Sequence, residues 1–144
     1  MAANLALGSL LVAMTVLIHS FGLITVSRHM PTMTRALHID SHSVGKAIAM
    51  VTVVLGIFFI HAIEIWLWAA MFILIGALKG LEDALFFSTA TFATTGTADM
   101  AVNPGWRLLA SLEGVNGFIL IGWSTAYLVT ASTRFGPFRR GEHF

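Results

Sequence analysis

A threonine-rich segment between two strongly apolar stretches limits the possible folds of this chain more than any other feature. Residues 88–99 read Ser-Thr-Ala-Thr-Phe-Ala-Thr-Thr-Gly-Thr-Ala-Asp and contain five threonines. Residues 81–94 can form a short helix, but at about 1.5 Å per residue it cannot cross a hydrocarbon core of about 30 Å. Polar backbone at membrane depth must be satisfied by protein or water. We therefore expect a re-entrant loop that enters as a helix and returns as extended chain.

The composition places this loop in a membrane protein. The chain has 144 residues, of which 57% are hydrophobic and 10% are charged, whereas soluble domains carry roughly 25% charged residues. We expect one all-α membrane domain with a few spans. The absence of cysteine excludes disulfides and thiolate metal sites. No basic tract or motif suggests binding to nucleic acid.

Three apolar runs are long enough to span a membrane, namely residues 5–27, 47–78 and 108–133. A signal peptide is the alternative for the first run. However, no Lys or Arg precedes that run and no clear cleavage site follows it, so we expect a retained helix. Residues 28–46 form a polar connector, in which we expect a short interfacial helix near 32–39.

The positive charges indicate the orientation. Three lie in the connector, three in the C-terminal tail and two near the threonine segment: Arg28, Arg35 and Lys46; Arg134, Arg139 and Arg140; Lys79 and Arg107. The positive-inside bias predicts that connector and tail are cytoplasmic and that the N-terminus and the threonine segment lie outside. Connector and tail can lie on the same side only if the chain has three spans plus a re-entrant helix and loop. We expect this arrangement in a plasma (inner) membrane.

A resemblance to a known family rests on residues 84–99 followed by Trp106-Arg107-Leu108. This stretch resembles the pore module of the two-helix potassium-channel family, which consists of an outer helix, a pore helix, a filter and an inner helix. The resemblance covers roughly residues 47–135, while 1–46 add a helix with its connector and 136–144 form a short cytoplasmic tail. It implies a homotetramer in a lipid bilayer that passes K⁺ or another monovalent cation, with no cofactor.

The resemblance also implies the ion-binding residues. The filter corresponds to Thr94, Thr95, Gly96, Thr97 and Ala98, and the outer mouth to Asp99. Carbonyl and hydroxyl oxygens of such a loop can replace water around a cation. Thr97 stands where the family has tyrosine and Ala98 where it has a second glycine, so we expect a rearranged outer half. Asp99 would form an acidic ring in a tetramer; the alternative is an exposed turn residue.

Further candidates lie on the predicted helices. Gly114 and Gly117 are either a hinge in the inner helix or sites of close helix packing. His61 and Glu64 are one helical turn apart, and ionisable groups at this depth are usually paired or face water. We consider a proton-sensitive polar latch, a metal pair with His19, and a clamp that holds the first helix to the pore module, and we favour the clamp. Glu113 is a third candidate member of the polar latch and is expected behind the filter or at its mouth.

Three functions are compatible with these features. The first is a tetrameric cation channel. The second is a non-conducting or regulatory membrane protein that retains the pore architecture, prompted by Thr97 and Ala98. The third is an intramembrane enzyme that uses His61 and Glu64, which no nucleophile–base pair, HExxH motif or cofactor loop supports. We favour the channel and expect no enzymatic activity.

Overall fold

The computed structural model describes residues 1–36, 43–96 and 102–135, and these ranges contain helices and no strand. The elements in chain order are α1 (Ala2–Ala36), α2 (Ser43–Leu74), α3 (Leu81–Phe92), the 3-10 helix η2 (Pro104–Trp106) and α4 (Arg107–Phe135). The structure therefore confirms the all-α class predicted from the sequence.

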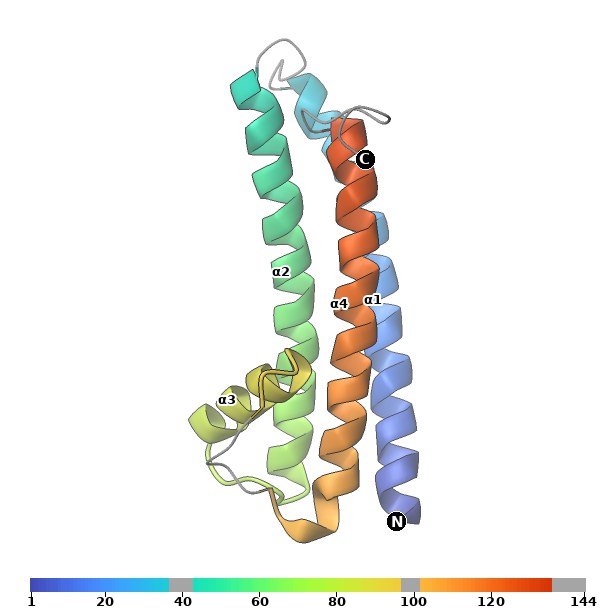
Figure 1. Ribbon diagram of the computed structural model, residues 1–144, viewed down its shortest axis with the longest axis vertical. Helices are drawn as coiled ribbons and strands as arrows, with labels where there is room; N and C mark the ends of the chain where they lie inside the picture. Colours follow the sequence, from blue (N-terminus) through green and yellow to red (C-terminus); the bar gives the residue numbers. More distant parts are fainter. Residues whose placement is uncertain (37–42, 97–101, 136–144) are drawn as a thin grey trace.

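Three of these helices can cross a membrane by length and composition, over Ala2–Thr32, Val44–Leu74 and Pro104–Arg134. They run side by side, and the much shorter α3 lies beside one end of them (Figure 1). The end of α2, the start of α4 and the N-terminus all lie at that end. The chain thus enters and leaves α3 on the same side of the bundle, as a re-entrant helix does, and the protein is an integral membrane protein.

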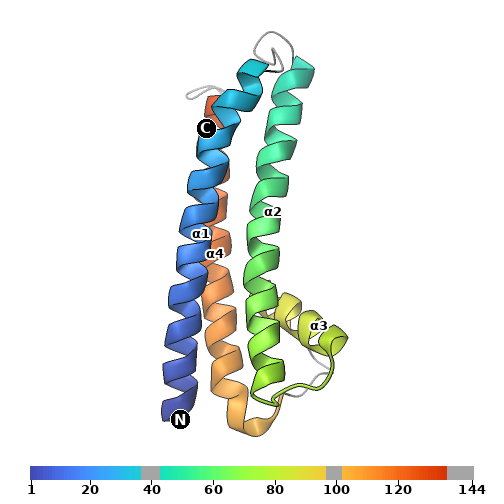
Figure 2. The same ribbon diagram turned by 180° about the vertical axis from the view of Figure 1, so that it is seen from behind.

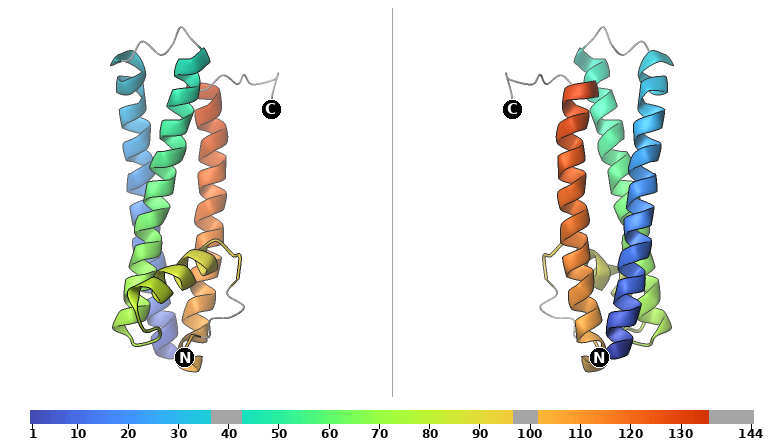
Figure 3. Two further views of the ribbon diagram at one scale, coloured as in Figure 1. Left: turned by 90° about the vertical axis from the view of Figure 1, so that its left-hand side faces the viewer. Right: turned by 90° about the vertical axis from the view of Figure 1, so that its right-hand side faces the viewer.

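The two sides of the α2–α4 pair are covered differently. On one side, α3 packs across both helices; on the other side, α1 packs along both (Figures 2 and 3). A core cluster at the α3 end includes Trp68, Phe72, Phe87 and Phe92. Exposed apolar side chains such as that of Phe58 cover much of the outside, as is expected of a surface that faces lipid.

The first helix is longer than the sequence predicted. We expected a polar connector from Arg28 with a separate interfacial helix, but α1 continues without a break through Pro31 to Ala36. Met30 explains this extension, because it is only 2% exposed and packs in a second core cluster with Val53 and Ala131. The connector histidines at 38 and 42 lie outside the described residues.

Polar side chains join α1 to α4 at intervals along the bundle. Asn4 donates to the carbonyl oxygen of Gly105 at 2.9 Å and accepts from the Leu109 amide at 3.1 Å, so it satisfies free backbone groups at the start of α4. Further along, the Asn116 amide donates to Thr15 Oγ1 at 2.9 Å. Near the opposite end, the hydroxyls of Ser27 and Tyr127 lie 2.9 Å apart. We call these three the α1–α4 polar contacts.

Candidate pore-lining site and its supports

The helix α3 begins with two acidic residues and ends next to the threonine segment. Glu82 and Asp83 lie in its first turn, where negative charge complements the positive end of the helix dipole. Its apolar side chains Phe87 and Phe92 are buried between α2 and α4. This packing fixes the direction in which the negative, C-terminal end of α3 points.

The end of α3 is a Schellman motif, the two-bond pattern that commonly ends helices. The Thr95 amide donates to the Ala90 carbonyl at 2.9 Å and the Thr94 amide donates to the Thr91 carbonyl at 3.0 Å. Thr94 has a φ of 58°, in the left-handed region where this motif usually has glycine. The left-handed conformation costs an L-residue about 1–2 kcal/mol. The left-handed backbone at Thr94 was not predicted from the sequence.

Residues 94–96 are exposed in the single chain. Gly96 also has a left-handed backbone, with a φ of 84°, and no atom of the described residues lies within 4 Å of the position that a Cβ would take. An open groove of about 340 Å³ between α3 and α4 is lined by Thr91, Thr94, Gly96 and Gly114, among others. Thr97, Ala98 and Asp99 lie outside the described residues, so their place in a filter remains a prediction.

The two candidate hinge glycines lie in the unbroken helix α4 and face the end of α3. A Cβ on Gly117 would lie 2.8 Å from the Cα and carbonyl carbon of Phe92 and closer still to the carbonyl oxygen. Gly114 is less crowded, since its Cβ would lie 3.5 Å from the Thr91 carbonyl oxygen. Gly117 therefore lets the backbones of α3 and α4 approach closely, which favours packing over the hinge. A hinge at either residue remains a prediction.

Glu113 lies apart from the other members of the candidate polar latch. It is fully buried on α4, and its polar neighbour across the helix pair is Ser88 of α3. Within the described part of the chain, neither its carboxylate oxygens nor the Ser88 hydroxyl has a partner at hydrogen-bond distance. Glu113 thus lies behind α3, and its position relative to the filter remains a prediction.

His61 and Glu64 lie together, with two further partners from other helices. The carboxylate of Glu64 lies 2.9 Å from Nδ1 of His61 and 3.0 Å from Nδ1 of His19 on α1. Nε2 of His61 and Nε2 of His19 lie 3.0 and 3.4 Å from the hydroxyl of Ser124 on α4. We call these four residues the His–Glu cluster. It joins α1, α2 and α4, which is the arrangement that the clamp hypothesis describes.

Aromatic rings enclose the His–Glu cluster and connect it to α3. The His61 ring meets the ring of Phe92, the last residue of α3, edge-on at 5.6 Å between centroids. The ring of Trp123 lies 5.3 Å from that of His19. His19 and Glu64 are fully buried and the His61 side chain is 15% exposed. The cluster is therefore a buried polar centre directly behind the end of α3.

The same residues are near enough to share a cation. One nitrogen from each histidine and one Glu64 oxygen lie within 4.8 Å of one another. A closed structural metal site takes four ligands from the protein, and here two histidines and one carboxylate are available. The described residues therefore offer one ligand fewer than a closed structural site takes.

The sequence analysis missed most partners of α1. It named His19 but not Asn4, Thr15, Asn116 or Ser124. One signal was present in the sequence: Asn4, Thr15 and His19 are 11 and 4 residues apart, so they share one face of an otherwise apolar helix. Polar residues along one face of a membrane helix indicate a helix–helix contact. Their partners on α4, about 100 residues away in the chain, carry no such signal.

The fold and the site together define a class of membrane protein. Two long helices hold a short re-entrant helix whose end presents an exposed threonine segment, and this is the arrangement of a channel pore module. A family model described as "Ion channel" matches residues 60–134, more than half of the chain. The chain therefore belongs to the ion-channel family, and the predicted resemblance to the potassium-channel pore module is confirmed. No curated protein and no solved structure matches the chain.

Proposed function

We propose that this chain is the subunit of a homotetrameric, potassium-channel-type cation channel and that residues 94–96 begin its selectivity filter. The observation that carries this proposal is the end of α3. There, Thr94 and Gly96 have left-handed backbones and are exposed beside an open groove, although they belong to a re-entrant segment of a membrane protein. Polar backbone in such a place needs a water-filled or protein-lined cavity.

The need for further subunits follows from the openness of this segment. One re-entrant loop contacts an ion from one side only, so a symmetric ring of loops is required to replace the hydration shell of the ion. Val115, Phe118 and Ile119 on α4 are between 58% and 70% exposed. In a closed cyclic assembly, neighbouring copies would cover part of this surface. Because the side of the α2–α4 pair covered by α1 faces away from α3, we propose that α1 lies at the periphery of the assembly.

The chemistry of ion binding would come from oxygen atoms. The carbonyl and hydroxyl groups of Thr94 and the carbonyl group of Thr95 would coordinate the cation, and Thr97, Ala98 and Asp99 would continue the path outward. The C-terminal end of α3 carries the negative end of its dipole and would stabilise a cation beneath the filter. We propose that Thr97 and Ala98 widen the outer half, so selectivity among monovalent cations depends on residues 94–96. The threonine segment and the N-terminus lie outside a plasma membrane in this proposal.

The proposal is tested by ion flux into liposomes that contain the purified protein. We expect K⁺-dependent flux from a tetramer, and loss of that flux in Thr94→Ala. The matched control is Thr130→Ala on the exposed face of α4, whose hydroxyl bonds only to the backbone one turn back. Subunit number is measured by native mass spectrometry of the same sample. An intact assembly without ion-dependent flux, or a stable assembly with another subunit number, contradicts the proposal.

A non-conducting or regulatory membrane protein with pore architecture is the second candidate. Thr97 and Ala98 support it, because they stand where the filter of the two-helix potassium-channel family has tyrosine and glycine. The double variant Thr97→Tyr with Ala98→Gly distinguishes the two functions. A current that appears only in the double variant supports the second candidate, whereas a current in the native sequence supports the first. Membership of an ion-channel family speaks against the enzyme considered from the sequence.

A further inference from the structure

The four polar groups of the His–Glu cluster form a closed cycle of contacts. From the carboxylate of Glu64, one path leads through His19 to the hydroxyl of Ser124, at 3.0 and 3.4 Å. The other path leads through His61 to the same hydroxyl, at 2.9 and 3.0 Å. Each imidazole uses both ring nitrogens and the carboxylate uses both oxygens. Four contacts therefore need four hydrogen atoms.

The usual protonation states supply only three. An ionised carboxylate carries none, a neutral imidazole carries one on one of its two nitrogens, and a hydroxyl carries one. If Glu64 is ionised and accepts from both Nδ1–H groups, both Nε2 atoms are acceptors that face the single hydrogen of Ser124. One of the four contacts would then bring two lone pairs together. An unsatisfied contact of this kind is costly in a buried site.

We propose that the His–Glu cluster is a proton-binding site that takes up one proton beyond these three and thereby holds α1 to the pore module. With four hydrogens every contact in the cycle is a hydrogen bond. The net charge of the cluster becomes zero, which membrane burial favours. Two arrangements satisfy the count. Either one histidine is an imidazolium beside an ionised Glu64, or Glu64 is protonated and the two histidines are opposite neutral tautomers.

The surroundings of the cluster support this assignment. The groups that face one another are His19 from α1, Glu64 and His61 from α2 and the hydroxyl from α4, closed off by the rings of Phe92 and Trp123. His61 also lines a cavity of about 260 Å³ between α2 and α3, so the cluster reaches the surface of the single chain at this residue. Because α1 lies outside the matched range 60–134, the cluster attaches an added helix to the pore module at the point where α3 ends.

The first test counts hydrogens directly in the protein in lipid bilayers. Nitrogen-15 NMR distinguishes the two neutral tautomers of histidine and the imidazolium. In the proton-bound state we expect His19 and His61 to give either one imidazolium signal or one signal of each tautomer. Raising the pH should convert both residues to the neutral Nδ1–H tautomer. Two Nδ1–H tautomers at every pH would overturn the proposal.

The variant Glu64→Gln provides the second test, because its amide supplies the fourth hydrogen without a charge. One amide hydrogen replaces the bound proton, so the cycle closes at every pH. The attachment of α1 is read from a disulfide between Gly8→Cys and Leu112→Cys. A Cβ at Gly8 would lie 3.6 Å from that of Leu112, within the disulfide range, and the chain has no other cysteine.

At each pH, the cross-linking rate in the native background is divided by the rate in the Glu64→Gln background, which removes the effect of pH on the thiols. We expect a ratio near one in acid and a decrease of roughly fivefold in alkali, the factor that one lost hydrogen bond gives. A ratio that stays constant with pH would overturn the proposal. Both readouts are independent of ion flux, so their failure is distinct from failure of the proposed channel.

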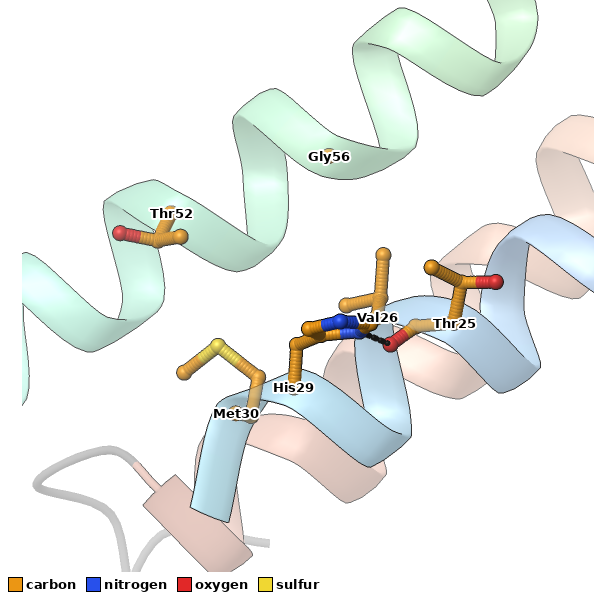
Figure 4. Close-up of a pocket in the computed structure, with 6 residues that line it drawn as sticks. All are labelled: Thr25, Val26, His29, Met30, Thr52 and Gly56. Carbon is orange, nitrogen blue, oxygen red and sulfur yellow. Dashed lines mark hydrogen bonds between the residues drawn. The ribbon is translucent and has the colours of Figure 1, made fainter. Parts of the chain in front are cut away.

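His29 provides the matched control on the same helix. It is exposed, its Nδ1 lies 2.9 Å from the Thr25 carbonyl oxygen, and it borders a cavity between α1 and α2 with Met30 and Gly56 (Figure 4). We expect His29→Gln to keep the pH response of the native chain, and loss of the response would contradict the assignment. Elemental analysis of the purified protein completes the test, since one bound transition-metal ion per chain would show that a metal takes the place of the proton.

Discussion

The ends of α2 and α3 have the same hydrogen-bond pattern but place different residues at the left-handed position. At the end of α2 the Ala77 amide bonds to the Phe72 carbonyl at 2.9 Å and the Gly76 amide bonds to the Ile73 carbonyl at 3.0 Å. Gly76 has a φ of 66°. At the end of α3 the corresponding bonds are 2.9 and 3.0 Å long, but the left-handed residue is Thr94.

The residue at the left-handed position distinguishes the end of α2, a structural turn, from the end of α3, a candidate functional one. Glycine adopts positive φ without strain, so Gly76 is the residue that a helix end of this kind favours. Threonine at the same position costs about 1–2 kcal/mol. Backbone strain that a fold tolerates is often found at functional sites. The strained backbone at Thr94 therefore supports the proposal that its side chain has a function.

The largest effect is expected where α4 packs against the end of α3. The end of α2 has no such contact, since no atom of the described residues lies within 4 Å of the position that a Cβ on Gly76 would take. Gly117→Ala would place a methyl group against backbone atoms of Phe92. Because these atoms belong to the backbone, rotation of a side chain cannot relieve the overlap. We expect a loss of about 1–3 kcal/mol in the free energy of unfolding, measured by denaturation in detergent, together with a loss of flux. Gly122→Ala is the control, because its Cβ meets nothing within 4 Å; equal effects of the two variants would contradict the contact.

The next effect is expected at the end of α2. Gly76→Thr reproduces the residue found in α3 and should lower the free energy of unfolding by about 1–2 kcal/mol, since it adds the left-handed strain. Because Gly76 lies in the turn after α2 and not in the exposed threonine segment, ion flux per folded protein should stay the same. Denaturation and liposome flux measured on one preparation check both parts, and a loss of flux from folded protein would refute the separation of the two ends.

The reverse exchange should have the opposite consequences. Thr94→Gly removes the strain and should raise the free energy of unfolding by up to about 1 kcal/mol, because glycine is favoured at this position. The same variant lacks the hydroxyl proposed to coordinate the cation, so flux should fall. A variant that is both more stable and fully conducting would show that the Thr94 side chain has no function.

The smallest effect concerns the hydroxyl of Thr95, which donates to the Ala90 carbonyl at 3.2 Å beside the backbone bond to the same oxygen. Thr95→Val removes only the side-chain bond and should cost at most about 1 kcal/mol. Thr89→Val is the comparison, because that hydroxyl bonds to the Leu85 carbonyl within α3. If Thr95→Val shifts the denaturation midpoint no more than Thr89→Val, the hydroxyl adds nothing to the motif.

The spans and the re-entrant helix could be predicted because apolar length determines what crosses a membrane. The runs near 47–78 and 108–133 correspond to α2 and α4, and the short helix expected over 81–94 is α3 (Leu81–Phe92). These predictions need only local sequence. The extension of α1 to Ala36 could not be read in this way, because it depends on the packing of Met30 against residues of two other helices.

The candidate site was predictable only in part, for the same reason. The spacing of His61 and Glu64 placed them on one helix face, but the hydroxyl that completes their network belongs to Ser124, 63 residues beyond His61. The left-handed backbone of Thr94 was also hidden, since threonine normally avoids this conformation. Contacts between distant segments and strained backbone arise from tertiary packing, which a single sequence does not display.

The α1–α4 polar contacts have a mechanical consequence. They connect the two helices by hydrogen bonds at three levels: Asn4 at the start of α4, Thr15 with Asn116, and Ser27 with Tyr127. If α4 moves while these hydrogen bonds stay intact, α1 must move with it as one rigid body through the surrounding lipid. The thickness of the bilayer then contributes to the free energy of that motion, so α1 couples any movement of α4 to the surrounding lipid.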